Sequence, residues 1–552
     1  MQPSPPLQLA KDILKDAAAS NCATRVSLAL VARHHLKDTP YAFPTSMQFW
    51  TAYRELLTEG LEKNEPLERA IRVKDVRTDS GVAPITVLTK PFPCPGRCVY
   101  CPTEARMPKS YISTEPAAAR ALGLEFDPYE QVRQRIMALE RNGHQANKIE
   151  LIVKGGTWSA YTADYREWFI TRCFQAANEI PHPPTPSPTD AGEGELEKAQ
   201  KINETAAYRI IGLTIETRPD WVKPKEVIHL RKLGVTRIEL GLQIINDRVL
   251  SYTKRGTTVA DAERAIALLK TAGFKVDVHI LPGQPGASVE DDLESFRLLF
   301  ADPRFRPDMV KIYPCVVLPN SELAEWMTKG EFKPLEGEEL LELLIKMQTM
   351  VPRYCRVPRV IRDFPTTQIA FGNKKSNLRE ILDAEMKKRG VQCVCLRCRE
   401  VGHVAGDHTG DKTQVFEERY ENAGGTEVFL SVENEDRSAV FAFLRMRLPL
   451  FSAFSPADAG EGCQIIYEAF PILKGAAIIR ELHTYGTALN IDQRDPLAAQ
   501  HKGYGRLLMQ KAEELAAAEG FDHMAVISGL GVREYYKILG YQEQDTYMAK
   551  TL

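Results

Sequence analysis

No apolar run in this sequence is long enough to cross a membrane. The chain has 552 residues, and none of its hydrophobic stretches reaches the roughly 18 residues that a transmembrane helix requires. The first ten residues contain three prolines and lack the basic and apolar regions of a secretory signal peptide. We therefore expect a cytoplasmic protein that has no membrane partner.

An excess of charge of either sign is also absent. The net charge is −2, 44% of the residues are hydrophobic and 26% are charged, as in ordinary globular proteins. Residues 353–390 differ, because they carry ten Lys and Arg residues against four Asp and Glu residues. Such a stretch either contacts phosphates or forms a solvated basic helix. The candidate phosphate contacts are Arg353, Arg356, Arg359, Arg362, Lys374, Lys375, Arg379, Lys387, Lys388 and Arg389, together with Lys11, Arg33 and Lys37 near the N-terminus.

The pattern of apolar residues divides the chain into four regions, as its length suggests. Residues 1–75 show helical spacing and are expected to form a small helical region. Residues 76–315 alternate short β-rich runs with helical stretches, which indicates parallel βαβ units in a partial barrel or an open sheet. The Pro-rich and acidic residues 180–200 interrupt this pattern, as expected for a mobile insertion. Residues 316–415 connect these units to a second α/β unit, which is expected at 416–552.

Six β-rich runs define the first α/β region. In parallel sheets and barrels, functional residues gather where the strands end at their carboxyl side. We therefore expect ligand-binding residues directly after these runs. The runs are Ile85–Leu88, Ile149–Val153, Ile210–Ile215, Arg237–Leu242, Val276–Leu281 and Met309–Tyr313.

Six of the eleven cysteines lie in two clusters, and clustered thiols in a cytosolic chain more often bind metal than form disulfides. Cys94, Cys98 and Cys101 follow the first β-rich run with the spacing C-x3-C-x2-C. Three thiolates on one tight loop can hold three irons of a 4Fe–4S cluster and leave the fourth iron open for a small ligand. Zinc is the structural alternative, although it usually takes four protein ligands.

This triplet resembles the cluster-binding motif of the radical S-adenosylmethionine (SAM) superfamily. The resemblance implies a 4Fe–4S cluster, SAM bound at its open iron, and an external electron donor. Glycines after the next strand would let the backbone approach the methionine end of SAM, with a plain turn as the alternative. The candidate SAM contacts are Gly155, Gly156 and Thr157 in K-G-G-T, Glu216 in T-I-E-T-R-P-D and Gln243 in E-L-G-L-Q.

The second cysteine cluster lies in the connecting region. Cys393, Cys395 and Cys398 place three thiols within six residues, and a structural zinc would need one more ligand. Three reduced surface thiols are the alternative. The sequence predicts a zinc site between the two α/β units. The candidates for the fourth ligand are Cys315, Cys355 and His403.

The C-terminal unit contains a Q-x-x-G-x-G motif that starts at Gln500 and precedes a predicted helix. Backbone N–H groups at such a helix N-terminus can bind a pyrophosphate. With R-E-L-H-T upstream and Y-Y-K-I-L-G-Y downstream, the order resembles the GNAT acetyltransferase fold, which implies acetyl-CoA as the ligand. Tyr535 would lie near the thioester, with core packing as the alternative. The candidate acetyl-CoA contacts are Glu481, Leu482, His483, Thr484, Gly503, Tyr504, Gly505 and Tyr535.

The motifs together resemble those of the catalytic subunit of Elongator and its stand-alone bacterial and archaeal counterparts. In addition to those above, the chain has K-R-G-T-T, H-I-L-P-G-Q-P-G, K-I-Y-P and N-L-R-E, and the resemblance covers about residues 75–552. The three-residue gap between Cys94 and Cys98 resembles the stand-alone prokaryotic form, because the eukaryotic subunit has a longer gap. In this family a lysine at the position of Lys148 contacts acetyl-CoA, so Lys148 is a further candidate.

The resemblance implies synthesis of 5-carboxymethyluridine in tRNA. A 5′-deoxyadenosyl radical would abstract hydrogen from the methyl group of acetyl-CoA, and the acetyl radical would add to C5 of the wobble uridine in the anticodon stem-loop. Hydrolysis of the thioester would complete the reaction, with Asp277 and His279 as candidate acid–base residues. Tyr252 and Lys254 are candidates for contact with the flipped base, and residues 1–75 for tRNA binding.

Other functions fit parts of the sequence. A protein lysine acetyltransferase with a structural iron–sulfur barrel would be active without SAM. A non-catalytic RNA-binding scaffold would tolerate Cys98→Ser. A different radical SAM reaction, such as methylthiolation, would leave the GNAT-like unit without a role. A homodimer is compatible with the sequence, which does not indicate the oligomeric state.

Overall fold

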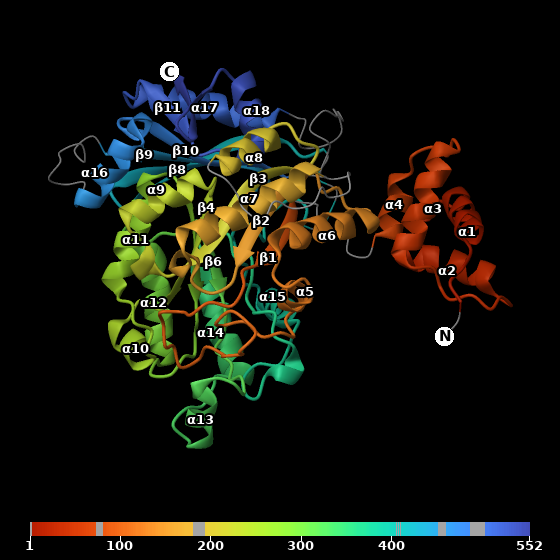
Figure 1. Cartoon of the computed structure of the whole chain (residues 1–552), viewed down its shortest axis with the longest axis horizontal. Helices are drawn as coiled ribbons and strands as arrows, with labels where there is room; N and C mark the ends of the chain where they lie inside the picture. The colour runs from red at the N-terminus through yellow and green to blue at the C-terminus, as the bar shows by residue number, and fades with distance from the viewer. Residues whose placement is uncertain are drawn as a thin grey trace.

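The computed structural model describes residues 3–72, 81–179, 194–404, 406, 408, 410–450, 460–485 and 503–552. They form two sheets with their helices and a group of N-terminal helices set apart from both (Figure 1). No helix in these ranges is both long and apolar enough to span a membrane. Gln500 and residues 180–193 of the predicted insertion lie outside the described residues.

The N-terminal group is helical, as predicted, and has a hydrophobic core of its own. Its link to the rest of the protein is through α3, where Trp50 lies against Gly143 and Arg54 donates a 2.8 Å hydrogen bond to the carbonyl of Glu140. Val26 and Leu30, which keep helical spacing in the sequence, are exposed, because α2 turns a different face to the core. The helices are α1 (Leu7–Ala19), α2 (Arg25–Leu36), α3 (Ser46–Thr58) and α4 (Glu65–Ile71).

The first sheet is the predicted partial barrel. All five strand pairs are parallel, and the strands follow one another in chain order from β1 to β6, so the sheet stays open between these two edges. Each strand covers the β-rich run predicted for it, with bounds that differ by a residue or two. The strands are β1 (Ala83–Leu88), β2 (Lys148–Lys154), β3 (Arg209–Thr217), β4 (Arg237–Gln243), β5 (Lys275–Ile280) and β6 (Met309–Ile312).

Helices cover the outer face of this sheet, and the chain between β6 and the second sheet packs against its open edge. Val310 donates a 2.9 Å hydrogen bond to the carbonyl of Arg356, so this segment runs beside β6.

Helix α8 starts at Glu195, so the prediction of a mobile insertion is wrong for residues 195–200. The helices are α5 (Pro116–Gly123), α6 (Pro128–Arg141), α7 (Ala163–Glu179), α8 (Glu195–Asn203), α9 (Pro224–Lys232), α10 (Asp247–Tyr252), α11 (Val259–Thr271), α12 (Val289–Ala301), α13 (Glu322–Thr328), α14 (Gly337–Met350) and α15 (Leu378–Lys388).

The second sheet has seven strands in the order β12-β13-β11-β10-β9-β8-β7. It is mixed, because β10 and β11 are parallel and the other pairs are antiparallel. It begins at Thr413, inside the region expected to be a connection. Its elements are β7 (Thr413–Asn422), β8 (Gly425–Asn434), β9 (Val440–Pro449), α16 (Gly460–Ala469), β10 (Ala477–Thr484), α17 (Tyr504–Ala518), β11 (His523–Val526), α18 (Arg533–Ile538), β12 (Gln542–Gln544) and β13 (Tyr547–Thr551).

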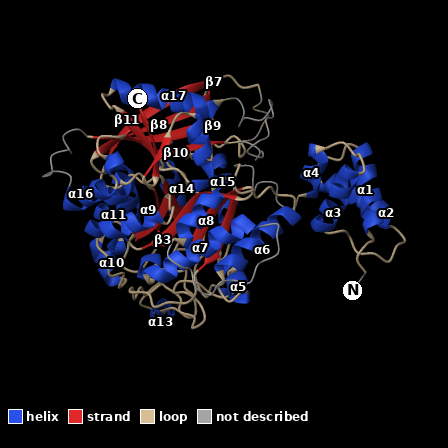
Figure 2. Cartoon of the chain, turned by 45° about the horizontal axis from the view of Figure 1, so that its top comes forward, coloured by secondary structure: helices blue, strands red, loops and turns tan. Residues whose placement is uncertain are grey.

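The two sheets meet at the end of the barrel where its strands begin. Figure 2 shows the strands of the second sheet above those of the first. Glu481 of β10 forms a 3.2 Å ion pair with Lys275, the first residue of β5. A Cβ at Gly529 would collide with the carbonyl of Ile211, so this glycine allows the segment before α18 to touch the backbone of β3. The strand predicted to hold acetyl-CoA therefore faces the amino-terminal end of the barrel.

Candidate functional site

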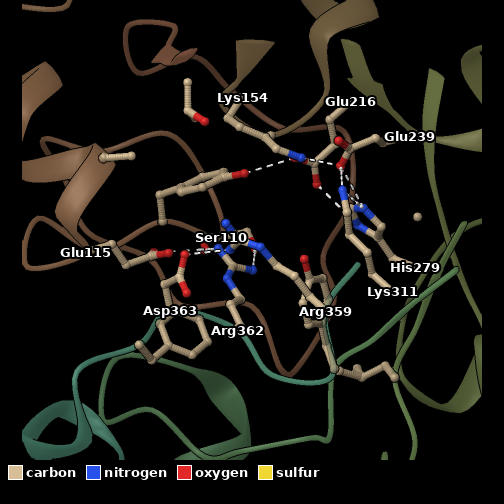
Figure 3. Close-up of a pocket in the computed structure, with 18 of the residues that line it drawn as sticks. Ser110, Glu115, Lys154, Glu216, Glu239, His279, Lys311, Arg359, Arg362 and Asp363 are labelled. Carbon is tan, nitrogen blue, oxygen red and sulfur yellow. Dashed lines mark hydrogen bonds and ion pairs between the residues drawn. The ribbon is translucent and has the colours of Figure 1, made fainter. Parts of the chain in front are cut away.

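A cavity of about 750 Å³ occupies the interior of the barrel and is lined by side chains from all six strands. It reaches from the strand starts, where Pro84, Arg237 and Met309 line it, to the loops beyond the strand ends. Figure 3 shows charged side chains from several strands pointing toward one another inside it. An open, charged interior differs from a typical (βα)8 barrel, whose centre is filled by branched apolar side chains.

The loop after β1 brings all three cysteines of the first cluster to the wall of this cavity. The thiols of Cys98 and Cys101 contact each other, and Cys94 Sγ lies 3.5 Å from Thr157 Oγ1. Buried Arg255 approaches Cys98 Sγ at 3.4 Å. Hydrogen bonding from Cys101 and the charge of Arg255 lower the pKa of Cys98 well below its ordinary value, against the effect of burial. Thiolates, not thiols, bind iron, so this donor set fits an iron–sulfur cluster.

The predicted SAM residues lie beside the cysteines. Gly155 and Gly156 have φ of +137° and +85°, and a Cβ at Gly155 would collide with Thr89. Only glycine fits this turn without strain, which explains the residue type at both positions. Gly156, Thr157, Glu216 and Gln243 line the cavity, whereas Gly155 lies behind its wall.

A network of buried charges lines the cavity below the cysteines. Lys154 forms ion pairs with Glu216, at 3.2 Å, and with Glu239. His279 Nε2 lies 2.9 Å from the carboxylate of Glu239, and Lys311 is paired with the same carboxylate. Burial would raise the pKa of Glu216, but the charges of Lys154 and His279 lower it to about 2. The carboxylates of Glu216 and Glu239, whose pKa values are both lowered, can therefore hold polar atoms of a ligand while ionised at neutral pH.

Several of these residues were not predicted as site residues. Glu239 and Lys311 interrupt the apolar strands R-I-E-L-G-L-Q and M-V-K-I, and a charge within a buried parallel strand was the signal that could have found them. Tyr111 donates a 2.9 Å hydrogen bond to Glu216 from the loop after the cysteines. No sequence pattern marks Tyr111, because its partner is distant in the chain. The candidates Asp277 and His279 both line the cavity.

The predicted acetyl-CoA residues come together only in part. Gly503 has φ of +77° at the start of α17. A Cβ at Gly505 would lie 2.9 Å from the Tyr535 hydroxyl and 3.7 Å from Thr484 Oγ1, so these three positions share one site. Tyr504 is different, because its ring is buried in the core of the second sheet. Any contact of Tyr504 with acetyl-CoA would therefore come from its backbone N–H at the turn.

The other candidate residues of β10 point toward the barrel or the core. Glu481 accepts a 2.8 Å hydrogen bond from Arg445 besides its pair with Lys275. His483 stacks on Phe443 with ring centroids 5.7 Å apart, and burial lowers its pKa. Leu482 packs against the hydrophobic core of the second sheet. Lys148, at the start of β2, is half-buried at the same end of the barrel, and burial and Arg209 lower its pKa.

The second cysteine cluster is assembled as predicted. The sulfurs of Cys393, Cys395 and Cys398 all lie within 4.8 Å of one another, and Arg379 donates to Cys398 Sγ at 3.2 Å. Among the described residues, no fourth His, Cys, Asp or Glu ligand joins this group. Cys315, Cys355 and His403, the predicted candidates, lie outside it.

Most of the predicted phosphate-binding arginines face inward. Arg356 is paired with Glu400 at 2.8 Å, Arg362 with Ser110 and Glu115, and Arg353, Arg379 and Arg389 also bond protein groups. Arg359 is paired with Asp363 and Lys388 with Glu385. Lys11 is buried between Glu55 and Glu59. Each of these arginines and Lys11 therefore already has a protein partner, although Arg359 and Arg389 are exposed and Arg356, Arg359 and Arg362 line the cavity. Lys374, Lys375 and Lys387 are exposed, and the described part of the chain offers them no ion-pair partner.

The two candidates for contact with the flipped base lie on one exposed turn. Tyr252 is 51% exposed and packs edge-on against Trp326 at 5.3 Å, whereas Lys254 is paired with Glu322. About half of the Tyr252 side chain is therefore open to solvent, whereas Lys254 already has a protein partner. Arg33 and Lys37 are on or next to α2, away from the cavity (Figure 1).

The chain is similar in sequence to radical SAM proteins. Residues 93–299 match the radical SAM superfamily, and residues 307–388 match the radical SAM C-terminal domain. The chain is 43% identical to a tRNA uridine(34) acetyltransferase of Methanocaldococcus infernus, over 89% of each chain. It is 37% identical to Elongator complex protein 3 of Bos taurus, over 98% of this chain and 94% of that protein.

A solved structure agrees with these relatives. The archaeal Methanocaldococcus infernus Elp3 with an N-terminal deletion (1–46) is 40% identical and superimposes with a TM-score of 0.70, covering 86% of this chain and 99% of that one. The chain therefore belongs to the family of the tRNA uridine(34) acetyltransferases and Elongator complex protein 3.

Proposed function

We propose that this protein is a radical SAM tRNA acyltransferase that converts the wobble uridine of tRNA to 5-carboxymethyluridine. The single observation that carries the proposal is that one chain joins a barrel with a three-cysteine loop on the wall of its cavity to a second sheet with a CoA-type glycine turn. The names of the relatives, tRNA uridine(34) acetyltransferase among them, support the same substrate. A 4Fe–4S cluster with bound SAM, reduced by an external donor, would supply a 5′-deoxyadenosyl radical.

The residues of the chain have distinct roles in this proposal. Cys94, Cys98 and Cys101 hold the cluster, and Gly155, Gly156 and Thr157 let SAM lie against the backbone. Glu216 and Gln243 orient its polar groups. In the second sheet, the N–H groups at Gly503 and Gly505 bind the CoA pyrophosphate, and Thr484 and Tyr535 lie near the thioester arm.

The experiment that tests this function is an anaerobic incubation with SAM, acetyl-CoA, reductant and tRNA, followed by mass analysis of the nucleosides. We expect 5-carboxymethyluridine only when all components are present. A protein lysine acetyltransferase would instead acetylate protein substrates without SAM and without reductant. Absence of the modified nucleoside from the complete reaction would contradict the proposal.

For tRNA binding, we propose that Lys374 and Lys375 contact phosphates. Both are exposed beside Asn373, which lines the cavity. Exchange of both lysines for glutamate is expected to weaken tRNA binding and to reduce the slope of log K against log salt by about 1 to 2, because each lost phosphate contact removes about 0.9. Filter binding at several salt concentrations measures this slope.

A matched control for this pair has the same change of charge at a different place. Lys223 and Lys225, at the start of α9, are exposed, and no ion pair involves them among the described residues. Lys223→Glu with Lys225→Glu should leave the slope close to that of the wild type. Equal effects of the two pairs would show that only net charge matters and would rule out this surface.

We also propose that Cys393, Cys395 and Cys398 bind a structural zinc. Three thiolates around Zn²⁺ leave a net negative charge, which the guanidinium of Arg379 beside Cys398 offsets. Elemental analysis of the anaerobically purified protein should find one zinc in addition to iron, and Cys395→Ser should lose the zinc but keep the iron. Protein that contains iron and no zinc would contradict this site.

A further inference from the structure

The spacing of residues along β2 gives the distance between the two proposed ligand sites. Successive side chains of a strand alternate in direction, so Lys148, Glu150, Ile152 and Lys154 lie on one face. Glu150, Ile152 and Lys154 line the cavity. Six steps of about 3.3 Å separate Lys148 from Lys154, which is about 20 Å. The proposed acetyl-CoA residue Lys148 and the SAM-binding turn after Lys154 therefore mark opposite ends of one strand face.

Other contacts also place the cysteine loop and the acetyl-CoA strand β10 at opposite ends of the barrel. The cysteines line the cavity beyond the strand ends. At the other end, Arg356 lines the cavity and donates a 2.9 Å hydrogen bond to the hydroxyl of Tyr485, the residue after β10. Glu150, near the start of β2, is close enough to Glu481 and His483 for their charges to act on its pKa. Strand β10 thus borders the entrance of the cavity.

This separation conflicts with the chemistry unless the acyl group moves. Hydrogen abstraction needs the reacting atoms at near-contact distance, about 3 to 3.5 Å. An acyl group that stayed on β10 would be separated from the radical by most of the length of the barrel. The cavity is the direct route between them, and it is continuous from the strand starts to the cysteines.

The walls of the cavity are fitted for a polar occupant. Glu239 Oε1, Asp277 Oδ1 and Arg237 Nε are buried, and none has a hydrogen-bond partner among the described residues. Glu239 is 0% exposed and Asp277 is 1% exposed. Buried polar atoms in native proteins normally have a partner, and all three residues line the cavity. A thioester carbonyl and the amides of a pantetheine arm offer donors and acceptors of the kind these atoms lack.

We propose that the barrel interior is the passage through which the acyl end of acetyl-CoA reaches the radical centre from β10. The proposal rests on the proposed function. Lys148 and Arg237 stand near its entrance, Asp277 lines its wall farther in, and Lys311 and Lys154 hold the acyl oxygen next to the cysteines. Ile152 and Thr86, which pair across β2 and β1, both line the cavity and carry no charge.

The passage can be tested by narrowing it with a larger side chain at Ile152, which carries no charge. Ile152→Trp adds bulk to an open cavity, so the fold and both ligand sites should be retained. We expect acetyl-CoA affinity by calorimetry and 5′-deoxyadenosine formation without acetyl-CoA to stay within about twofold of the wild type. Formation of 5-carboxymethyluridine should fall by about a hundredfold, the loss expected when a reacting group is displaced by an ångström or more. Ile152→Leu, which conserves volume, is the control and should behave as the wild type.

The passage would be overturned if the Ile152→Trp variant is folded, holds its cluster and acetyl-CoA, and still forms 5-carboxymethyluridine as fast as the wild type. Thr86→Phe narrows the passage from β1, so it decides the question if Ile152→Trp loses the cluster or acetyl-CoA binding. A wild-type protein that makes no 5-carboxymethyluridine would count against the proposed function instead, which separates the two failures.

Discussion

Replacement of Cys98 by serine is expected to abolish formation of 5-carboxymethyluridine. Cys98 is the most buried of the three cysteines on the loop after β1, its thiol contacts Cys101, and Arg255 points at its sulfur from 3.4 Å. A serine hydroxyl does not ionise at neutral pH and is a poor iron ligand, so one corner of the cluster site is lost. We expect a loss of about 10³-fold or more, which corresponds to over 4 kcal/mol of transition-state stabilisation.

Two further measurements distinguish a lost cluster from a damaged fold. Iron content and the absorption of the cluster should fall in Cys98→Ser, whereas acetyl-CoA should bind as in the wild type, because the second sheet is not changed. Cys463→Ser is the matched control. This half-buried thiol of α16 lies 3.4 Å from Oγ1 of Thr271 in α11, and it does not line the cavity. Full activity in Cys98→Ser would support the scaffold or lysine acetyltransferase alternatives.

Features of local sequence predicted the parts of the site that depend on one short segment. The C-x3-C-x2-C loop, the paired glycines and the glycines before α17 each require particular residue types at fixed spacing, and the structure shows the reason. Gly155 and Gly503, for example, have positive φ. The six β-rich runs were equally local, because a buried parallel strand is apolar over its length. All six strands were therefore predicted, and with them the partial barrel.

Features that depend on distant partners were predicted poorly. A count of charges in residues 353–390 treats Arg356 and Lys374 alike, but Arg356 is paired with Glu400 and Tyr485, whereas Lys374 is exposed. Lys11 was a candidate phosphate contact for the same reason, but Glu55 and Glu59 pair with it when α1 packs on α3. The sign of a charge can be read from the sequence, but the direction of its side chain depends on residues far away in the chain.

Distant partners also hold the two sheets together, and Asp308→Asn is expected to weaken this contact by about 3 to 5 kcal/mol. Asp308 is fully buried just before β6. Its carboxylate pairs with Arg480 of β10 at 2.6 Å and with Lys270 of α11 at 3.0 Å, and accepts a 2.8 Å hydrogen bond from Val276 N. Burial would raise the pKa of Asp308, but Arg480 and Lys270 hold it well below its ordinary value. This stabilisation is therefore present at neutral pH and is lost only in acid, as the carboxylate is protonated.

The large destabilisation expected for Asp308→Asn comes from buried positive charge that is left without a partner, and this cause can be tested by a second substitution. In Asp308→Asn, Arg480 and Lys270 remain buried, and Glu427 is the anion left beside Arg480, at 2.5 Å. Uncompensated buried charge is what makes breaking such a group costly. Arg445 is a third buried cation, 3.7 Å from Asp308. Lys270→Met added to Asp308→Asn removes one of these three cations, so the double variant should recover part of the lost stability in urea unfolding. If the second substitution instead adds its own full destabilisation, charge imbalance is not the cause, and the loss must come from the hydrogen bond to Val276 and from packing.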